Sequence, residues 1–319
     1  MHKFWTSYSK AILALGFSFG LMLLFKWLGV LVYDTNDDTI MAAISYGYYG
    51  IPQAGLVYIH PWLGALLAAL QRAVPGLSWY LLMEMGILGV SMAVLVWLYL
   101  EQTHGGQAVL GLTVFGLLFV YTMLFSLQYT KIAGISTASG ILLLFYAVRE
   151  GHGPGAYILG LLLALLGLCL RSAAFFMVLI PLAGVGAACL LSQLRQGDIR
   201  QGVKLVGVFA VLFALCGGLL WGQNRFYASD PQWAVYQRFN ALRTELMDYG
   251  FPDYGENQAV YASLGISEED LALYKSWDFA DPEIFNAEAM QTLVDAKPKT
   301  TFSFQRLLQC GKGAVQGLV

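Results

Sequence analysis

Charge is scarce in this chain. Only 12% of its 319 residues are charged and 58% are hydrophobic, whereas soluble domains carry about a quarter charged residues. This composition excludes an ordinary soluble globular protein. Basic residues gather only in short loops and the formal net charge is -2, so we expect no nucleic-acid partner.

Cysteine is also rare and follows no pairing pattern. Cys169, Cys189 and Cys216 lie inside apolar runs, and Cys310 stands alone near the end of the chain. No two of them have the spacing of a disulfide framework or a metal site. We therefore expect these thiols to fill apolar cores, as free cysteines usually do.

Long apolar runs predict an all-α polytopic membrane protein with about seven transmembrane helices. A helix needs about 20 residues to cross the hydrocarbon layer. Seven candidate runs lie near residues 11–32, 78–100, 108–128, 132–148, 156–170, 172–192 and 202–222. The first run is longer than the apolar core of a cleaved signal peptide and lacks a small-residue cleavage site, so we interpret it as a membrane anchor.

Loop charges predict the orientation of these helices. With seven spans and a cytoplasmic N-terminus, most basic loop residues, including the cluster RQGDIRQGVK at 195–204, face the cytoplasm, as the positive-inside rule requires. Residues 33–77 then form a large first outer loop, and residues 223–300 lie outside. A short apolar segment from Pro61 suits an interfacial or re-entrant helix, because an eighth span would place that basic cluster outside.

Residues 223–300 form a different, acidic region with helical signals. From Arg225 to Lys299 there are 13 acidic and 6 basic residues. Ser267 and Asp270 have the spacing of a capping box, and Asp281 followed by Pro282 predicts another helix start. Residues 301–319 look like the beginning of a further membrane segment, as if the chain were part of a longer protein.

Three carboxylates follow the first apolar run in the stretch YDTNDDT. Asp37 and Asp38 are adjacent, and Asp34 lies closer to the membrane. Carboxylates in such a loop can accept a proton from a nucleophile or bind a divalent cation such as Mg²⁺ or Mn²⁺. The alternative is a solvated turn that caps the following helix.

Cations stand at the same predicted outer boundary. Lys131 and Arg171 lie in apolar surroundings at the ends of predicted spans, and Arg72 lies in the first outer loop. Such cations can hold a phosphate group, although snorkelling to lipid headgroups is the alternative. Glu84 lies one turn into the second span, where we expect Lys26, Lys131 or Arg171 as its partner.

The first outer loop is rich in aromatic residues, among them Tyr48, Tyr49 and Trp62, with His60 between them. Aromatic residues at this depth usually form an interfacial belt. They also stack on carbohydrate rings, so these four residues are candidates to line a sugar site. No second histidine lies at a metal-ligand spacing from His60.

The order of one span, an outer loop that begins with adjacent acids, six more spans and an outer soluble region resembles the GT-C superfamily of membrane glycosyltransferases. The resemblance covers about residues 1–222. It implies transfer of a sugar from a polyprenyl-phosphate donor to a cell-surface glycan or protein on the outer face of a bacterial cytoplasmic membrane. It also implies that Asp37 or Asp38, and less securely Asp34, activates the acceptor or binds a metal.

The chain departs from the superfamily in lacking the WWD motif of oligosaccharyltransferases. Two other functions remain open. A transporter or flippase would use intramembrane charges as a substrate path, and a non-catalytic scaffold would present the acidic region to a partner. A scaffold predicts that alanine at Asp37 and Asp38 affects local stability alone.

Overall fold

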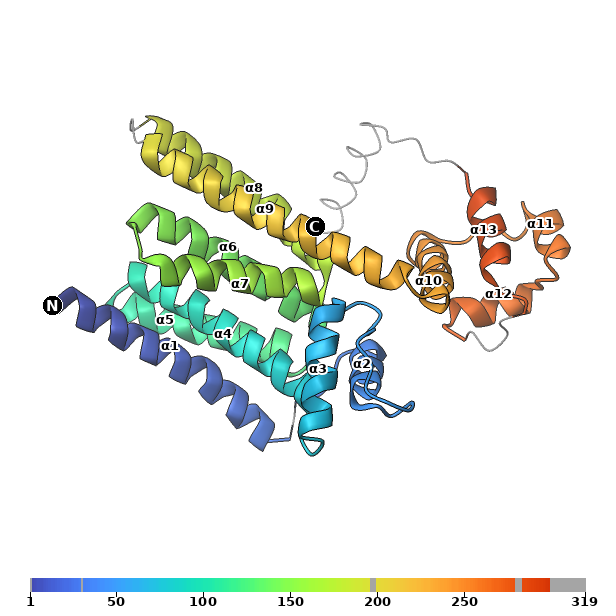
Figure 1. Ribbon diagram of the computed structural model, residues 1–319, viewed down its shortest axis with the longest axis horizontal. Coiled ribbons are helices and arrows are strands. Elements are labelled where there is room, and N and C mark those ends of the chain that lie inside the picture. The colour runs from blue at the N-terminus through green and yellow to red at the C-terminus, as the bar shows by residue number, and fades with distance from the viewer. Residues whose placement is uncertain (1, 30, 196–198, 279–282, 299–319) are drawn as a thin grey trace. The chain divides into compact units, whose positions relative to one another are not determined.

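The computed structural model describes residues 2–29, 31–195, 199–278 and 283–298 (Figure 1). The chain divides into two compact units, Met1–Phe226 and the part from Tyr227 onward. Within the described ranges every regular element is a helix, and six helices are long and apolar enough to cross a membrane. The chain is therefore an all-α polytopic membrane protein.

The first unit is a bundle of long helices with two short helices at one of its ends (Figure 1). The six long apolar elements are α1 (His2–Trp27), α4 (Trp79–Gln102), α5 (Gly105–Phe119) with the π-helical turn Val120–Leu124, α6 (Tyr129–Glu150), α8 (Ser172–Arg195) and α9 (Ile199–Ala228). All seven predicted runs form helices, but the fifth, α7 (Pro154–Leu170), has only 17 residues. The short helices are α2 (Asn36–Tyr46) and α3 (Pro61–Ala73).

The first helix ends earlier than its apolar run predicts. Gly29 has φ +70, a left-handed conformation typical of the residue after a helix end, and Tyr33 then forms an isolated β-bridge with Leu127. The N–H of Asp34 donates to the carbonyl oxygen of Leu127 and the N–H of Leu127 donates to that of Val32, each at 2.8 Å. The segment that carries the acids is thus attached by its backbone to the segment that precedes α6.

Small residues bring α6 and α7 into close contact. A Cβ atom on Gly140 would lie 2.5 Å from the backbone nitrogen of Ala164 and 2.6 Å from the carbonyl oxygen of Gly160. A Cβ on Gly167 would overlap Thr137. Small residues about four positions apart let membrane helices approach in this way. This seam fixes the first residue of α6 relative to the end of α7.

His60 anchors the predicted short helix α3 to the bundle. Its Nδ1 accepts a hydrogen bond from the N–H of Trp62 at 3.2 Å, so its Nε2 carries the proton and donates to the carbonyl oxygen of Leu219 at 2.9 Å. The backbone N–H of His60 donates to the carbonyl oxygen of Cys169 at 2.7 Å. These bonds tie the beginning of α3 to the end of α7 and to α9.

The second unit is a small helical domain with its own apolar core. Its helices are α10 (Pro231–Tyr249), α11 (Gln258–Ser263), α12 (Glu268–Lys275) and α13 (Ala287–Ala296). The core consists of Leu246, Tyr261, Ile266, Leu271, Tyr274, Phe285, Met290 and Leu293. An independent core explains why an acidic sequence with few long apolar runs still forms a compact unit.

The predicted helix signals of this unit have different outcomes. The capping box at Ser267 and Asp270 is confirmed, with both reciprocal hydrogen bonds present. The last helix of the described residues begins at Ala287 with Asn286 as its cap, so the predicted start at Asp281 and Pro282 is wrong for this helix. Asp281 and Pro282 lie outside the described residues, as does the predicted further membrane segment 301–319.

Replacing Ser267 by alanine should destabilise α12 by about 1 kcal/mol, because the first turn loses its side-chain acceptor. The Ser267 hydroxyl and N–H also hold the pKa of Asp270 below its usual range. We expect faster amide hydrogen exchange in peptides covering 265–276 of the full chain. Ser263→Ala, at an exposed serine that bonds only its own helix, is the control. Equal exchange rates for the Ser267 variant and the wild type would contradict this role.

Candidate functional site

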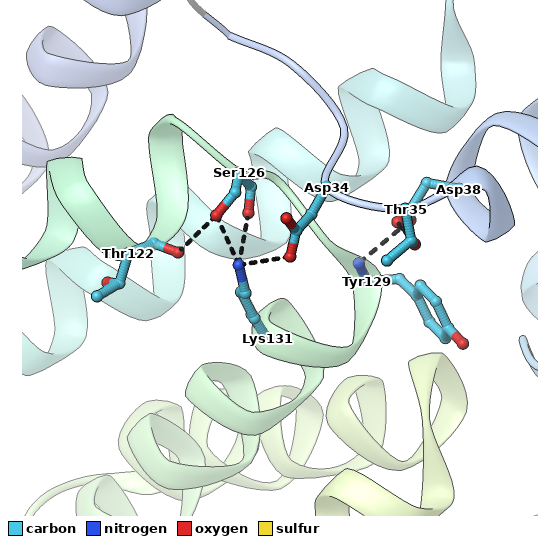
Figure 2. Close-up of polar contacts among 7 residues, drawn as sticks. All are labelled: Asp34, Thr35, Asp38, Thr122, Ser126, Tyr129 and Lys131. Carbon is cyan, nitrogen blue, oxygen red and sulfur yellow. Dashed lines mark hydrogen bonds and ion pairs between the residues drawn. The ribbon is translucent and has the colours of Figure 1, made fainter. Parts of the chain in front are cut away.

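Acidic and basic residues from separate parts of the sequence meet at one end of the helical bundle. At this end α1 finishes, α4 and α6 begin, and α7 ends. Figure 2 shows Asp34 and Asp38, from the segment after α1, facing Lys131 and Tyr129 at the start of α6. The structure thus brings together most of the charged residues that the sequence singled out.

Lys131 is held in place by three acceptors. Its Nζ lies 2.9 Å from Asp34 Oδ2, 2.6 Å from Ser126 Oγ and 3.1 Å from the Ser126 carbonyl oxygen (Figure 2). These contacts match the three donors of an ammonium group. Lys131 is therefore part of an ion-pair network, and snorkelling alone does not describe it. It can bind another anion only by exchanging one of these acceptors.

A π-helical turn lies beside this ion pair. The turn Val120–Leu124 ends α5 just before Ser126, and π-helical turns occur frequently at functional sites. A cavity of about 500 Å³ is lined by Tyr121, Thr122, Phe125, Ser126 and Lys131 among others. The ammonium group of Lys131 thus borders open space that a small polar group can enter.

Asp38 is fully buried, which contradicts the alternative of a solvated capping turn. Its Oδ1 accepts hydrogen bonds from the Tyr80 hydroxyl at 3.0 Å and the Tyr129 N–H at 3.2 Å, and its Oδ2 accepts one from the Thr35 hydroxyl at 3.3 Å. The N-cap residue of α2 is Thr35, and it makes no side-chain capping bond. Burial raises the pKa of Asp38 above its usual range, although these hydrogen bonds act in the opposite direction. Asp38 therefore joins α2 to α4 and α6.

Glu84 faces a second carboxyl group rather than a cation. The predicted partners Lys26, Lys131 and Arg171 are wrong, because no ion pair in the described part of the chain includes Glu84. Its side chain is fully buried beside Asp38, and neither of its oxygens meets a donor there. Two buried carboxyl groups in contact cannot both be ionised at low cost.

Asp37 is the accessible member of the adjacent pair. Its side chain is half-buried, and its Oδ2 lies 3.4 Å from the hydroxyl of Tyr129. At this distance the hydrogen bond is weak, which leaves the carboxylate free to take a proton from another hydroxyl group. Asp37 is therefore better placed for base chemistry than Asp38.

Arg171 lies on the aromatic residues next to Asp37. Its guanidinium carbon is 4.2 Å from the ring centre of Tyr58 and 5.7 Å from that of Tyr129, and the two rings stack at 5.9 Å. No carboxylate of the described residues lies within ion-pair distance of Arg171. Cation–π contacts hold the group in place, and its N–H donors remain available to an anion.

The remaining predicted residues do not join this cluster. Arg72 is exposed and donates to the Pro52 carbonyl oxygen at 2.8 Å. His60 is buried with both ring nitrogens in use, so its predicted role in lining a sugar site is wrong. Tyr48, Tyr49 and Trp62 expose their rings, and their contact with a sugar stays a prediction.

The acids do not fit a divalent cation well. Both oxygens of Asp38 already accept hydrogen bonds and Asp34 pairs with Lys131, whereas Mg²⁺ or Mn²⁺ needs several oxygen ligands around one point. Within the described ranges no three His, Cys, Asp or Glu side chains cluster around a common point. The carboxylates of the described residues therefore do not form a site for a divalent cation.

Comparisons with family models, with curated proteins and with solved structures found no match for this chain.

Proposed function

We propose that this chain is a membrane glycosyltransferase that moves a sugar from a polyprenyl-phosphate carrier to a cell-surface glycan or protein on the outer face of a bacterial cytoplasmic membrane. The observation that carries the proposal is that an accessible carboxylate, Asp37, lies near Arg171, whose guanidinium group meets no carboxylate among the described residues. Tyr129 connects the two, because its hydroxyl contacts Asp37 and its ring contacts Arg171.

Asp37 is the general base in this proposal. It takes the proton from the acceptor hydroxyl while the oxygen attacks the anomeric carbon of the donor sugar. The bond between that carbon and the carrier phosphate breaks, and its electron pair leaves with the phosphate oxygen. The products are the glycosylated acceptor, the polyprenyl phosphate and a proton on Asp37.

Arg171 binds the phosphate of the donor and stabilises the negative charge that develops on the departing oxygen. A guanidinium group offers two parallel N–H donors, which match two phosphate oxygens. Lys131 contributes a second positive charge from the edge of its cavity, although its donors are already engaged. A donor carried on a membrane lipid accounts for a polar site at the end of a bundle of apolar helices.

The test is transfer of radiolabelled sugar from a panel of polyprenyl-phosphate donors in membranes that contain the full chain. Arg171→Gln should raise the KM for the donor by about 10- to 100-fold, because a hydrogen bond to a charged group contributes roughly 1.5–3 kcal/mol. The KM of Arg171→Lys should lie between those of the wild type and Arg171→Gln, because lysine keeps the positive charge but lacks the planar pair of donors.

Arg149→Gln is the matched control, because Arg149 is exposed and lies at the opposite end of α6 beside Glu150. A KM for Arg171→Gln equal to that of the control would exclude phosphate binding by Arg171. No transfer from any donor, with the chain intact in the membrane, would count against the glycosyltransferase itself.

The buried pair of Asp38 and Glu84 favours a second candidate, a proton-coupled transporter. Carboxyl groups buried among membrane helices often relay protons. Against this function, the charged side chains of the described long helices lie toward the helix ends, and the buried polar side chains near the middle of α4 and α6, such as Ser91 and Thr137, are uncharged. The transporter would be favoured if vesicles that contain the chain show no glycosyl transfer but take up or release a solute in a manner that depends on a proton gradient.

A further inference from the structure

A second polar cavity lies at the opposite end of the bundle from the charged cluster described above. It has a volume of about 980 Å³ and lies among the beginning of α1, the end of α4 and the end of α6. Its lining includes Lys10, Trp97, Glu101, Tyr146, Glu150 and His152. None of these residues belongs to the proposed glycosyl-transfer site.

Glu101 has an unused hydrogen-bond acceptor at this cavity. Its Oε2 lies 3.7 Å from Lys10 Nζ, which is an ion-pair distance but too long for a hydrogen bond. Its Oε1 meets no donor in the described part of the chain, and only 18% of the side chain is exposed. A largely buried carboxylate without a short hydrogen bond among the described residues is costly, and a bound amine would supply a donor to its accessible oxygen, Oε2.

Aromatic rings beside Glu101 favour the same kind of ligand. Trp97 and Tyr146 pack edge to face with ring centres 5.4 Å apart, and His152 packs against both. Indole and phenol faces attract a cationic group. Glu150, which pairs with Arg149 at 3.3 Å, is a second carboxylate on the lining, and Lys10 provides a positive charge for the anionic part of a ligand.

An apolar cavity continues from the polar one. It has a volume of about 290 Å³, lies among α1, α4, α6 and α7, and shares Ala11 and Trp97 with the polar cavity. Its other lining residues are apolar, such as Leu15, Val90 and Leu143. The two cavities together have the form of a headgroup site joined to a site for a hydrocarbon chain.

We propose that these joined cavities bind a zwitterionic phospholipid with a primary amine headgroup, of the phosphatidylethanolamine type. Its ammonium group donates to Glu101 and lies against Trp97, its phosphate contacts Lys10, and one acyl chain follows the apolar cavity past Ala11. A phosphatidylcholine headgroup has no N–H to donate to Glu101, and an anionic phosphatidylglycerol headgroup meets two carboxylates. The lipid site is separate from the proposed transfer site, so lipid binding does not depend on glycosyl transfer.

The test is native mass spectrometry of the purified full chain in detergent with equimolar phosphatidylethanolamine, phosphatidylcholine and phosphatidylglycerol of identical acyl chains. For the wild type we expect a preference for phosphatidylethanolamine of about tenfold, the ratio that one charge-assisted hydrogen bond provides. Glu101→Gln should abolish this preference. Glu256→Gln, an exposed glutamate of the second unit, should retain it.

A second variant keeps the proposal testable if Glu101→Gln does not fold. Ala11→Phe fills the junction of the two cavities and should reduce adducts of phosphatidylethanolamine while Lys10 and Glu101 remain. Equal adducts of the three lipids on the wild type would overturn the proposal. So would an unchanged preference in a folded Glu101→Gln protein, or unchanged binding by Ala11→Phe.

Discussion

Replacing Asp37 by asparagine should lower the rate of sugar transfer by about 10²- to 10⁴-fold, the contribution of a positioned general base. Asparagine keeps the size of the side chain and can still accept the weak hydrogen bond from the Tyr129 hydroxyl. Folding should therefore change little, and the loss should appear in kcat with a nearly constant KM for the donor. Transfer assays at several donor concentrations measure both quantities.

The control for this variant is Asp248→Asn, at an exposed position of the second unit. It makes the same chemical change away from the cluster and should leave transfer at the wild-type rate. Asp37→Asn protein that is equally abundant and fully active would remove Asp37 from the mechanism. In that case the only other accessible acid of the stretch is Asp34, which is paired with Lys131.

Gly140→Ala should destabilise the first unit by about 3 kcal/mol, because the added methyl group meets backbone atoms of α7 rather than a flexible side chain. Gly134→Ala, in the same helix, is the control. Its new Cβ would lie 3.7 Å from Val178, which is an ordinary van der Waals distance. That change should be neutral or stabilising, because alanine favours helix over glycine by about 1 kcal/mol. Thermal unfolding in detergent, followed by tryptophan fluorescence, measures both variants.

If Gly140→Ala lowers the thermal stability and Gly134→Ala does not, close backbone contact is the feature that holds α6 against α7. A Gly140→Ala protein as stable as Gly134→Ala would contradict this packing. We also expect Gly140→Ala to reduce transfer, because the seam fixes Tyr129 at the start of α6 relative to Arg171 at the end of α7.

The long helices could be predicted from the sequence because apolar length alone decides them. The early end of α1 could not, because Leu28, Val30, Leu31 and Val32 are all apolar and continue the run. Only Gly29 marks the break, and a single glycine is common within membrane helices. The helix start at Ala287 could not be predicted either, because Asn286 and Asp281 are both acceptable N-cap residues.

The arrangement of side chains in the candidate site could be predicted from the sequence only in part. Adjacent residues on a helix point about 100° apart, so the pair Asp37 and Asp38 had to face two directions, but the sequence does not say which side chain turns inward. The contact between Asp38 and Glu84 joins residues 46 positions apart by their numbering. No charge or periodicity signal predicts a contact between two acids, because charge alone favours a cation as the partner.

The connection between α1 and α4 is attached to the bundle at three separate places. Its beginning pairs with Leu127, Asp38 bonds to Tyr80 and Tyr129, and His60 bonds to α7 and α9. The conformational entropy of this long connection is therefore lost when the protein folds. A substrate that binds beside Asp37 meets a surface that is already ordered, and its affinity is not reduced by the cost of arranging a loop around it.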